Sequence, residues 1–140
     1  MDESALDCQL FRHGATLIWC GAALKSCKTH TGMLLAYCWL RSRGLKVMVH
    51  DLTNPMLAHL SHLQMAANLH TAAGVETNSM QFYPQASDQE ARIHRGAYRR
   101  RNGRVNLSTL RGPGFGYRLE EIKRMLPEPE TVVESAGAGG

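Results

Sequence analysis

The sequence has few of the features by which membrane and secreted proteins are recognised. No apolar run reaches the roughly 18 residues that a membrane-spanning helix needs, so we expect no transmembrane segment. The first residues, MDESALDCQL, carry acidic side chains where a signal peptide carries basic ones, so we expect no secretion. Carboxylates are scarce after this start, because Asp51 is the sole one between Asp7 and Glu76. We therefore predict a cytoplasmic protein.

Catalytic motifs are missing as well. Catalysis needs a clustered acid, base or nucleophile, and the sequence has no paired carboxylates and no G-x-S-x-G, H-E-x-x-H or Walker A motif. The glycine-rich run at 112–116 lacks the Gly-Lys-Ser/Thr ending of a phosphate-binding loop. We expect a protein that is not an enzyme and has no cofactor.

Cysteine and histidine do not form a recognisable metal site. The cysteines at positions 8, 20, 27 and 38 include no C-x-x-C pair, so we interpret them as reduced, buried thiols. Two disulfides, a zinc site from Cys20, Cys27 and His30, and a metal site from His59 and His62 remain as alternatives. Because neither metal site has an evident further ligand, we predict no bound metal.

Positive charge is concentrated in the last third of the chain. The 140 residues suffice for one domain with a single core, and sixteen Lys and Arg against twelve Asp and Glu give a net charge of +4. Between Arg92 and Arg124, ten basic residues face only Glu120 and Glu121. Arginine forks onto phosphate and guanine better than lysine does, so this block predicts a DNA-binding surface. The candidate DNA-binding residues are Arg92, Arg95, Arg99, Arg100, Arg101, Arg104 and Arg111.

Hydrophobic spacing predicts the elements of the first half. Short apolar runs predict strands at 9–11 and 16–20. A helix capped by Thr29 or Thr31 should end before Gly44; it is apolar on both sides, which predicts a central position. Alternation predicts an extended segment at 45–49, and the pattern after Pro55 predicts a helix over 56–73.

The second half is predicted as a loop, a basic helix and a hairpin. Residues 75–86 lack a clear period and predict a loop, with Phe82 and Tyr83 as anchors to the core. A capping box at Ser87–Glu90 should start a basic helix that ends near 102–103. Residues 105–111 and 115–119 predict the two strands of a basic β-hairpin.

The basic helix and the hairpin also resemble a known family. The hairpin resembles the T-V-R-G-x-G-Y-R-L wing of the OmpR/PhoB-type effector domain of bacterial response regulators. The matching positions are Thr109, Arg111, Gly112, Gly116, Tyr117, Arg118 and Leu119. Ile93, His94 and the 98–101 stretch resemble the recognition helix of that family, and the resemblance spans residues 9–120. It implies a winged helix without the family's phosphate-accepting receiver domain.

These observations together give one main prediction and two alternatives. We predict an α+β winged helix-turn-helix with short N-terminal strands, three helices and a C-terminal β-hairpin wing over residues 1–126, followed by a disordered acidic and glycine-rich tail at 127–140. Its function would be that of a stand-alone bacterial or phage transcription regulator in the nucleoid that binds double-stranded DNA, with RNA polymerase or a second copy of the chain as further partners. The alternatives are a small adaptor or inhibitor that binds a partner protein through its helices, and an RNA-binding module that uses Tyr98, Phe115 and Tyr117.

Overall fold

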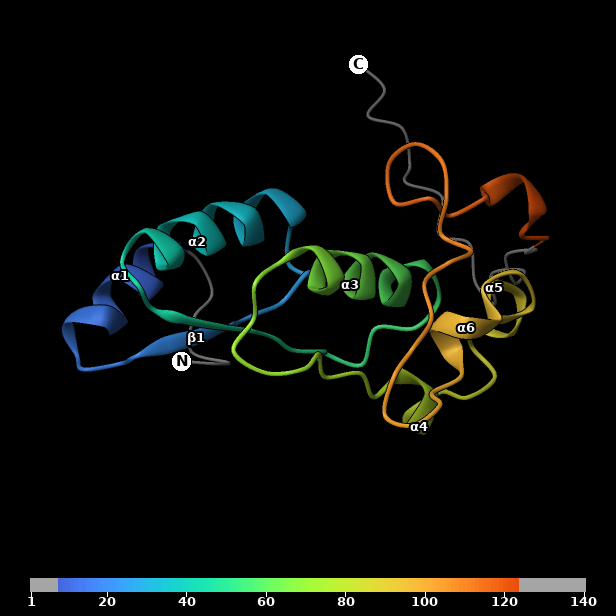
Figure 1. The fold of residues 1–140 in the computed structure, drawn as a ribbon, viewed down its shortest axis with the longest axis horizontal. Helices are drawn as coiled ribbons and strands as arrows, with labels where there is room; N and C mark the ends of the chain where they lie inside the picture. The colour runs from blue at the N-terminus through green and yellow to red at the C-terminus, as the bar shows by residue number, and fades with distance from the viewer. Residues whose placement is uncertain (1–7, 124–140) are drawn as a thin grey trace, which may run out of the picture.

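The structure, a computed structural model, describes residues 8–123 and has a mixed α+β fold. Figure 1 shows an elongated molecule in which α3 lies between one end that holds α1, α2 and the strands and another end that holds α4, α5 and α6. The elements in chain order are α1 (Cys8–Thr16), β1 (Gly21–Leu24), α2 (His30–Ser42), β2 (Lys46–Val49), α3 (Met56–Asn68), α4 (Ser79–Phe82), α5 (Asp88–Ile93), α6 (Arg95–Tyr98) and a 3-10 turn, η1 (Leu119–Glu121).

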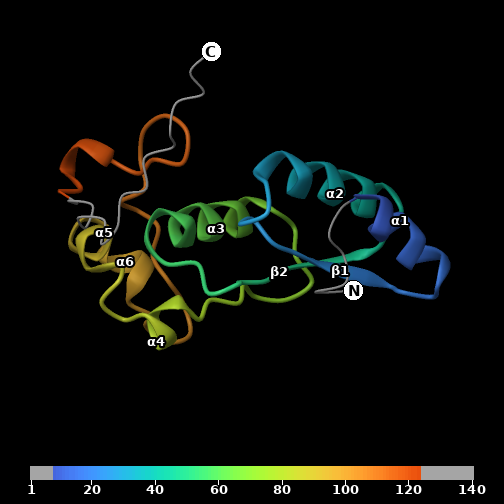
Figure 2. The same cartoon turned by 180° about the vertical axis from the view of Figure 1, so that it is seen from behind.

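The two strands and α2 form a βαβ unit. β1 pairs with β2 in parallel, in a register that runs from Gly21 opposite Lys46 to Leu24 opposite Val49. Figure 2 shows the strands side by side below α2, which connects them as the crossover that a parallel pair needs. A Cβ on Gly21 would lie 2.4 Å from the carbonyl oxygen of Lys46, so this close pairing requires glycine. Among the described residues this is the one regular sheet.

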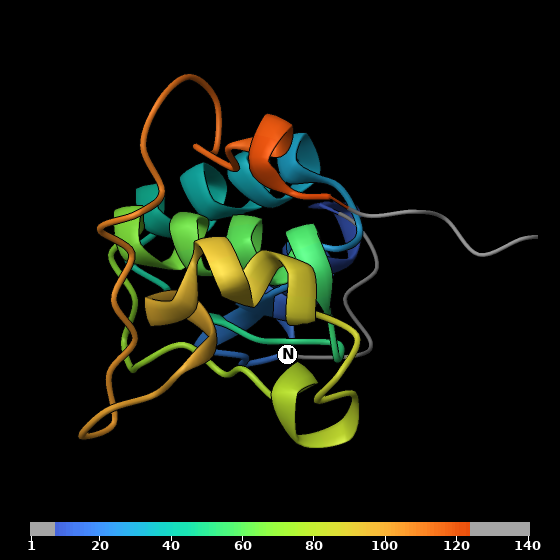
Figure 3. The ribbon, with the colours of Figure 1, turned by 90° about the vertical axis from the view of Figure 1, so that its right-hand side faces the viewer.

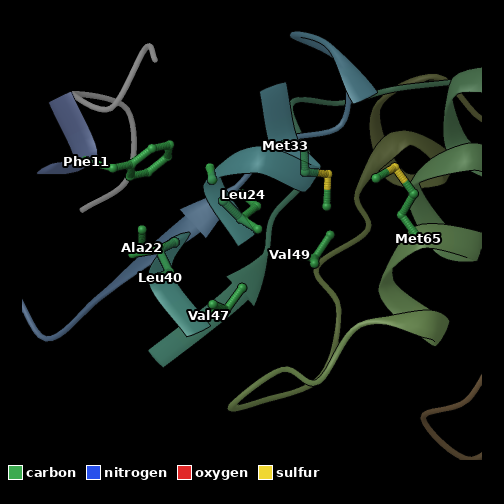
Figure 4. Packing of buried hydrophobic residues seen from close by; sticks show 9 residues of the cluster. Phe11, Ala22, Leu24, Met33, Leu40, Val47, Val49 and Met65 are labelled. Carbon is green, nitrogen blue, oxygen red and sulfur yellow. The ribbon is translucent and has the colours of Figure 1, made fainter. Parts of the chain in front are cut away.

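The first apolar cluster joins the βαβ unit to its neighbouring helices. Leu24, Val47 and Val49 of the strands pack against Met33 and Leu40 of α2. Phe11 of α1 and Met65 of α3 close the two sides of this cluster (Figure 4). α2 is buried on one side only, because Leu34 and Leu35 are 45% and 60% exposed. The prediction of a central helix, apolar all round, is therefore wrong.

The second apolar cluster lies on the other side of α3. Leu60 and Leu63 of α3 pack against Ala97 and Tyr98 of α6 and against Leu110. α3 thus contributes to both clusters and connects the two ends of the molecule.

Local signals predicted α2 and β2 correctly. The Thr29 hydroxyl accepts a hydrogen bond from the Gly32 amide at 2.9 Å and caps α2. Gly44, two residues beyond the helix, has a φ of +69°, which suits glycine at the end of a helix. β2 covers the predicted extended segment, whereas α3 ends at Asn68, five residues before the expected end.

Removal of the α2 cap should have a measurable effect. Thr29→Ala leaves the Gly32 amide without its acceptor, so the free energy of unfolding should fall by about 1 kcal/mol in a urea titration. Thr31→Ala is the matched control, because Thr31 is exposed in the first turn and has no capping role. Equal effects of the two substitutions would contradict the capping role of Thr29.

The predicted N-terminal strands at 9–11 and 16–20 are wrong. Residues 8–16 form α1 instead, and Phe11 and Gly14 are both buried, three residues apart, as on one face of a helix. Short apolar runs do not distinguish a strand from a buried helical segment. The strand that follows, β1, begins only at Gly21.

The predicted basic helix exists as two short helices. The chain breaks between α5 and α6 at His94, whose φ of −111° and ψ of 46° are not helical. The Thr109 hydroxyl and the Tyr117 carbonyl contact the His94 ring and hold it at this break. The predicted helix start is confirmed, because α5 begins at Asp88 with Ser87 as its N-cap. The capping hydrogen bond is not formed, because the Ser87 hydroxyl accepts from the Met56 amide at the start of α3 instead.

The hairpin wing predicted at 105–119 is not formed. No strand lies between Val105 and Arg118, and the segment is an irregular run of turns in which Gly112, Gly114 and Gly116 have positive φ. The winged-helix architecture is therefore not confirmed, and the sheet that does form is parallel and lies near the N-terminus. The ends of the predicted domain (1–126) and the predicted disordered tail (127–140) lie outside the described residues.

Three smaller predictions also have an outcome. The predicted loop at 75–86 contains the short helix α4, and Phe82 and Tyr83 are exposed rather than anchored in the core. Cys20, Cys27 and Cys38 are free and exposed, so the prediction of buried thiols is wrong for these three. No helix within residues 8–123 is both long and apolar enough to cross a membrane.

Candidate nucleic-acid interface

Four of the seven predicted arginines line one groove beside α6. The groove has a volume of about 680 Å³ and lies between α6 and residues 101–109. Figure 3 shows the chain turning back after α6 and running past that helix. The arginines that line the groove, called the arginine groove below, are Arg95, Arg99, Arg101 and Arg104.

A tight turn presents two of these arginines. The amide of Arg101 donates to the carbonyl of Arg104 at 2.8 Å, and the amide of Arg104 donates back at 2.9 Å. The central residues Asn102 and Gly103 have φ values of +50° and +73°, as a type I′ turn requires. The helix end predicted near 102–103 is therefore a turn, and Asn-Gly is the strongest short signal for such a turn. The basic segment therefore contains a two-residue turn at 102–103 that is closed by one antiparallel bridge between Arg101 and Arg104.

A close backbone contact holds the segment after the turn against α6. The Asn106 amide donates to the Gly96 carbonyl at 2.9 Å. A Cβ on Gly96 would lie 2.5 Å from the Asn106 carbonyl oxygen, so only glycine permits this approach. A glycine inside a regular helix only weakens that helix. Here Gly96 lets residues 105–106 lie against α6, and together they form one side of the arginine groove.

The guanidinium groups of the arginine groove have no carboxylate partner in the part of the chain that the structure describes. Within residues 8–123, none of the four makes an ion pair or a side-chain hydrogen bond, and no carboxylate lines the groove. All four residues are exposed. Like charges gathered in one concave surface create a positive potential that attracts anions. Asn106 and Ser108 add polar side chains to the same lining.

The other three predicted arginines lie elsewhere. Arg92 is exposed on α5 and does not line the groove. Arg100 points to a separate pocket, where its Nη2 donates to the carbonyl oxygen and the hydroxyl of Thr77 at 3.2 and 2.9 Å. The Nε of Arg111 donates to the carbonyl of Ser108 at 2.6 Å.

Three histidines form buried polar contacts that sequence reasoning missed. We interpreted His59 and His62 as a polar, solvated face of a helix or a metal pair, but both are buried, as is His94. Each ring has a backbone carbonyl at Nε2 and a hydroxyl at Nδ1. The partner pairs are Ala97 O and Ser79 Oγ for His59, Glu76 O and Ser26 Oγ for His62, and Tyr117 O and Thr109 Oγ1 for His94.

The carbonyl partners fix the position of one hydrogen on each ring. A carbonyl oxygen only accepts, so each Nε2 carries a hydrogen and donates it, whereas the hydroxyl at each Nδ1 can donate or accept. Burial lowers the pKa of His59 and of His62 below the ordinary value of 6.5. Within the described part of the chain, no group of three or more His, Cys, Asp or Glu side chains could hold a metal ion.

No family model, no curated protein and no solved structure matches this chain. The resemblance to the winged-helix family therefore stays a prediction.

Proposed function

We propose that this chain is a DNA-binding transcription regulator that contacts the phosphate backbone of double-stranded DNA through the arginine groove. The observation that carries the proposal is the gathering in one groove of four exposed guanidinium groups that have no carboxylate partner within residues 8–123. Duplex DNA carries about one negative charge per 1.7 Å of its axis, and guanidinium forks bind phosphate with two parallel hydrogen bonds. Four such groups on adjacent elements can contact several phosphates at once.

The shape of the site favours backbone contacts over base reading. α6 has only four residues and α5 only six, which is short for a helix that reads base edges along a major groove. The Arg101–Arg104 turn has small residues at its tip, so its two arginines can approach a narrow minor groove or the flanking phosphates. We therefore expect strong dependence on salt and weak dependence on base sequence.

A salt titration tests this function. If the four arginines each contact a phosphate, the log–log slope of affinity against salt should be about −3.6, from about −0.9 per contact. The slope is measured by fluorescence anisotropy with a labelled random duplex. The salt concentration runs from about 50 to about 200 mM, the range over which phosphate contacts strongly change the affinity. A slope near zero would exclude the proposed function.

A charge-matched pair of variants locates the contact. Arg101→Ala with Arg104→Ala removes two contacts, so the slope should become less steep by about 1.8. The control is Arg12→Ala with Arg41→Ala, which removes the same charge from exposed positions on α1 and α2. If the control variant weakens binding as much as the first variant, net charge rather than the arginine groove is responsible.

A second candidate function is that of an adaptor for a partner protein. It is favoured by Leu34 and Leu35, neighbouring apolar side chains that α2 leaves exposed. If the chain is folded and its affinity for duplex DNA does not depend on salt, this function is favoured over DNA binding.

A further inference from the structure

A second pocket lies on the other side of α6 from the arginine groove. It is bounded by α3, α4 and α6, and it has a volume of about 290 Å³. Val105 lines both the pocket and the arginine groove, but none of the four groove arginines lines the pocket.

The pocket has one cation, which is fixed at its edge. Nη2 of Arg100 donates to the carbonyl oxygen and to the hydroxyl of Thr77, so the guanidinium is held in place from one side. Its Nε and Nη1 have no hydrogen-bond partner within the part of the chain that the structure describes. A positioned guanidinium with unused donors is suited to bind a carboxylate.

The remaining lining combines apolar side chains, polar atoms bonded within the protein and the exposed side-chain amide of Gln81. Met80, Ala97 and Val105 contribute apolar surface. The rings of His59 and Tyr98 stack with centroids 4.7 Å apart and an interplanar angle of 30°. The ring nitrogens of His59 bind Ala97 and Ser79, and the Tyr98 hydroxyl donates to the Met56 carbonyl at 2.6 Å.

From this combination we infer that the pocket is a binding site for a small, flat, apolar molecule with a single carboxylate, such as an aromatic monocarboxylic acid. The apolar and aromatic surfaces bury the ring, and Arg100 binds the carboxylate. One guanidinium matches one negative charge, whereas the arginine groove, with four, matches a polyanion. The inference does not depend on DNA binding.

Two probes of the same shape test the inference on the unmodified protein. Benzoate has the proposed charge and benzamide lacks it. In a titration followed by amide chemical shifts, benzoate should shift resonances of residues around Ala97 and Val105, with low millimolar affinity. Benzamide should bind about tenfold more weakly, because it loses the charge-assisted hydrogen bond to Arg100. Absence of benzoate binding, or equal affinity of the two probes, would overturn the inference.

Two adjacent arginines provide a matched pair of variants. Arg100→Ala should reduce the affinity for benzoate about tenfold and leave the salt slope for DNA nearly unchanged. Arg101→Ala should leave benzoate binding unchanged and make the DNA slope less steep, because Arg101 lines the arginine groove and not the pocket. Loss of benzoate binding in Arg101→Ala would place the carboxylate in the arginine groove and refute the pocket. Because the two readouts are separate, failure of one proposal leaves the test of the other intact.

Discussion

Gly96→Val is expected to remove most of the DNA affinity and to lower the free energy of unfolding by roughly 2–3 kcal/mol. The Cβ of any side chain at Gly96 would lie 2.5 Å from the carbonyl oxygen and 2.9 Å from the Cβ of Asn106. The segment after the Arg101–Arg104 turn must then move away from α6, which breaks the hydrogen bond between Asn106 and Gly96. Urea titration measures the loss of stability, and fluorescence anisotropy measures the loss of affinity.

Gly74→Ala is the matched control for this variant. Nothing lies within 4 Å of a Cβ at Gly74, and its φ is not positive, so alanine should be neutral or stabilise the chain by up to about 1 kcal/mol. Normal stability of Gly96→Val would contradict the close approach. Reduced stability with undiminished DNA affinity would instead show that the arginine groove is not the DNA-binding surface.

Acidification is expected to destabilise the chain steeply below pH 6.5. Burial lowers the pKa of His59 and of His62 in the folded chain, so the unfolded chain binds more protons below its own pKa of about 6.5. The contribution of the two histidines to the free energy of unfolding is therefore fully present above about pH 6.5. It decreases as the pH falls toward the lowered pKa values of the folded chain. Two histidines give a slope of up to about 2.7 kcal/mol per pH unit, at about 1.36 each.

The surroundings of His62 contain opposing charges that do not reverse this direction. Asp51 and Glu76 raise the pKa of His62 and His50 lowers it, but the effect of burial is the largest. Urea titrations between pH 7.5 and 5.5 should show the slope, which His62→Gln should reduce by up to half. His70→Gln, which replaces an exposed histidine, is the matched control. A slope that survives His62→Gln in full would assign the acid sensitivity to other groups.

The elements that sequence predicted well are those with local determinants. A capping hydroxyl at Thr29, a glycine at 44 and alternation in 46–49 act within a few residues, and each produced the expected structure. The break at His94 depends on Thr109 and on the Tyr117 carbonyl, which lie 15 and 23 residues further along the chain. A helical pattern read from nearby residues contains no trace of such contacts.

The sequence predicted which part of the chain carries the positive charge of the candidate site, but it did not predict the groove in which the arginines lie. The density of arginine identified Arg95, Arg99, Arg101 and Arg104, but it also included Arg100, which points to the other side of α6. The arginines came together because of the 102–103 turn and the close approach at Gly96. The turn had a readable signal in Asn-Gly; the approach at Gly96 depends on a partner ten residues away.

The sharing of α3 between two apolar clusters sets an order for assembly during synthesis. Every buried member of the first cluster, from Phe11 to Met65, precedes the arginine-bearing segment in the chain. At a translation rate of about 5–20 residues per second, that cluster can form a few seconds before residues 95–104 leave the ribosome. When they do, Leu60 and Leu63 are already presented by a helix that Met65 anchors. The arginine-bearing segment is thus synthesised after every buried residue of the first cluster, which can form a support for it.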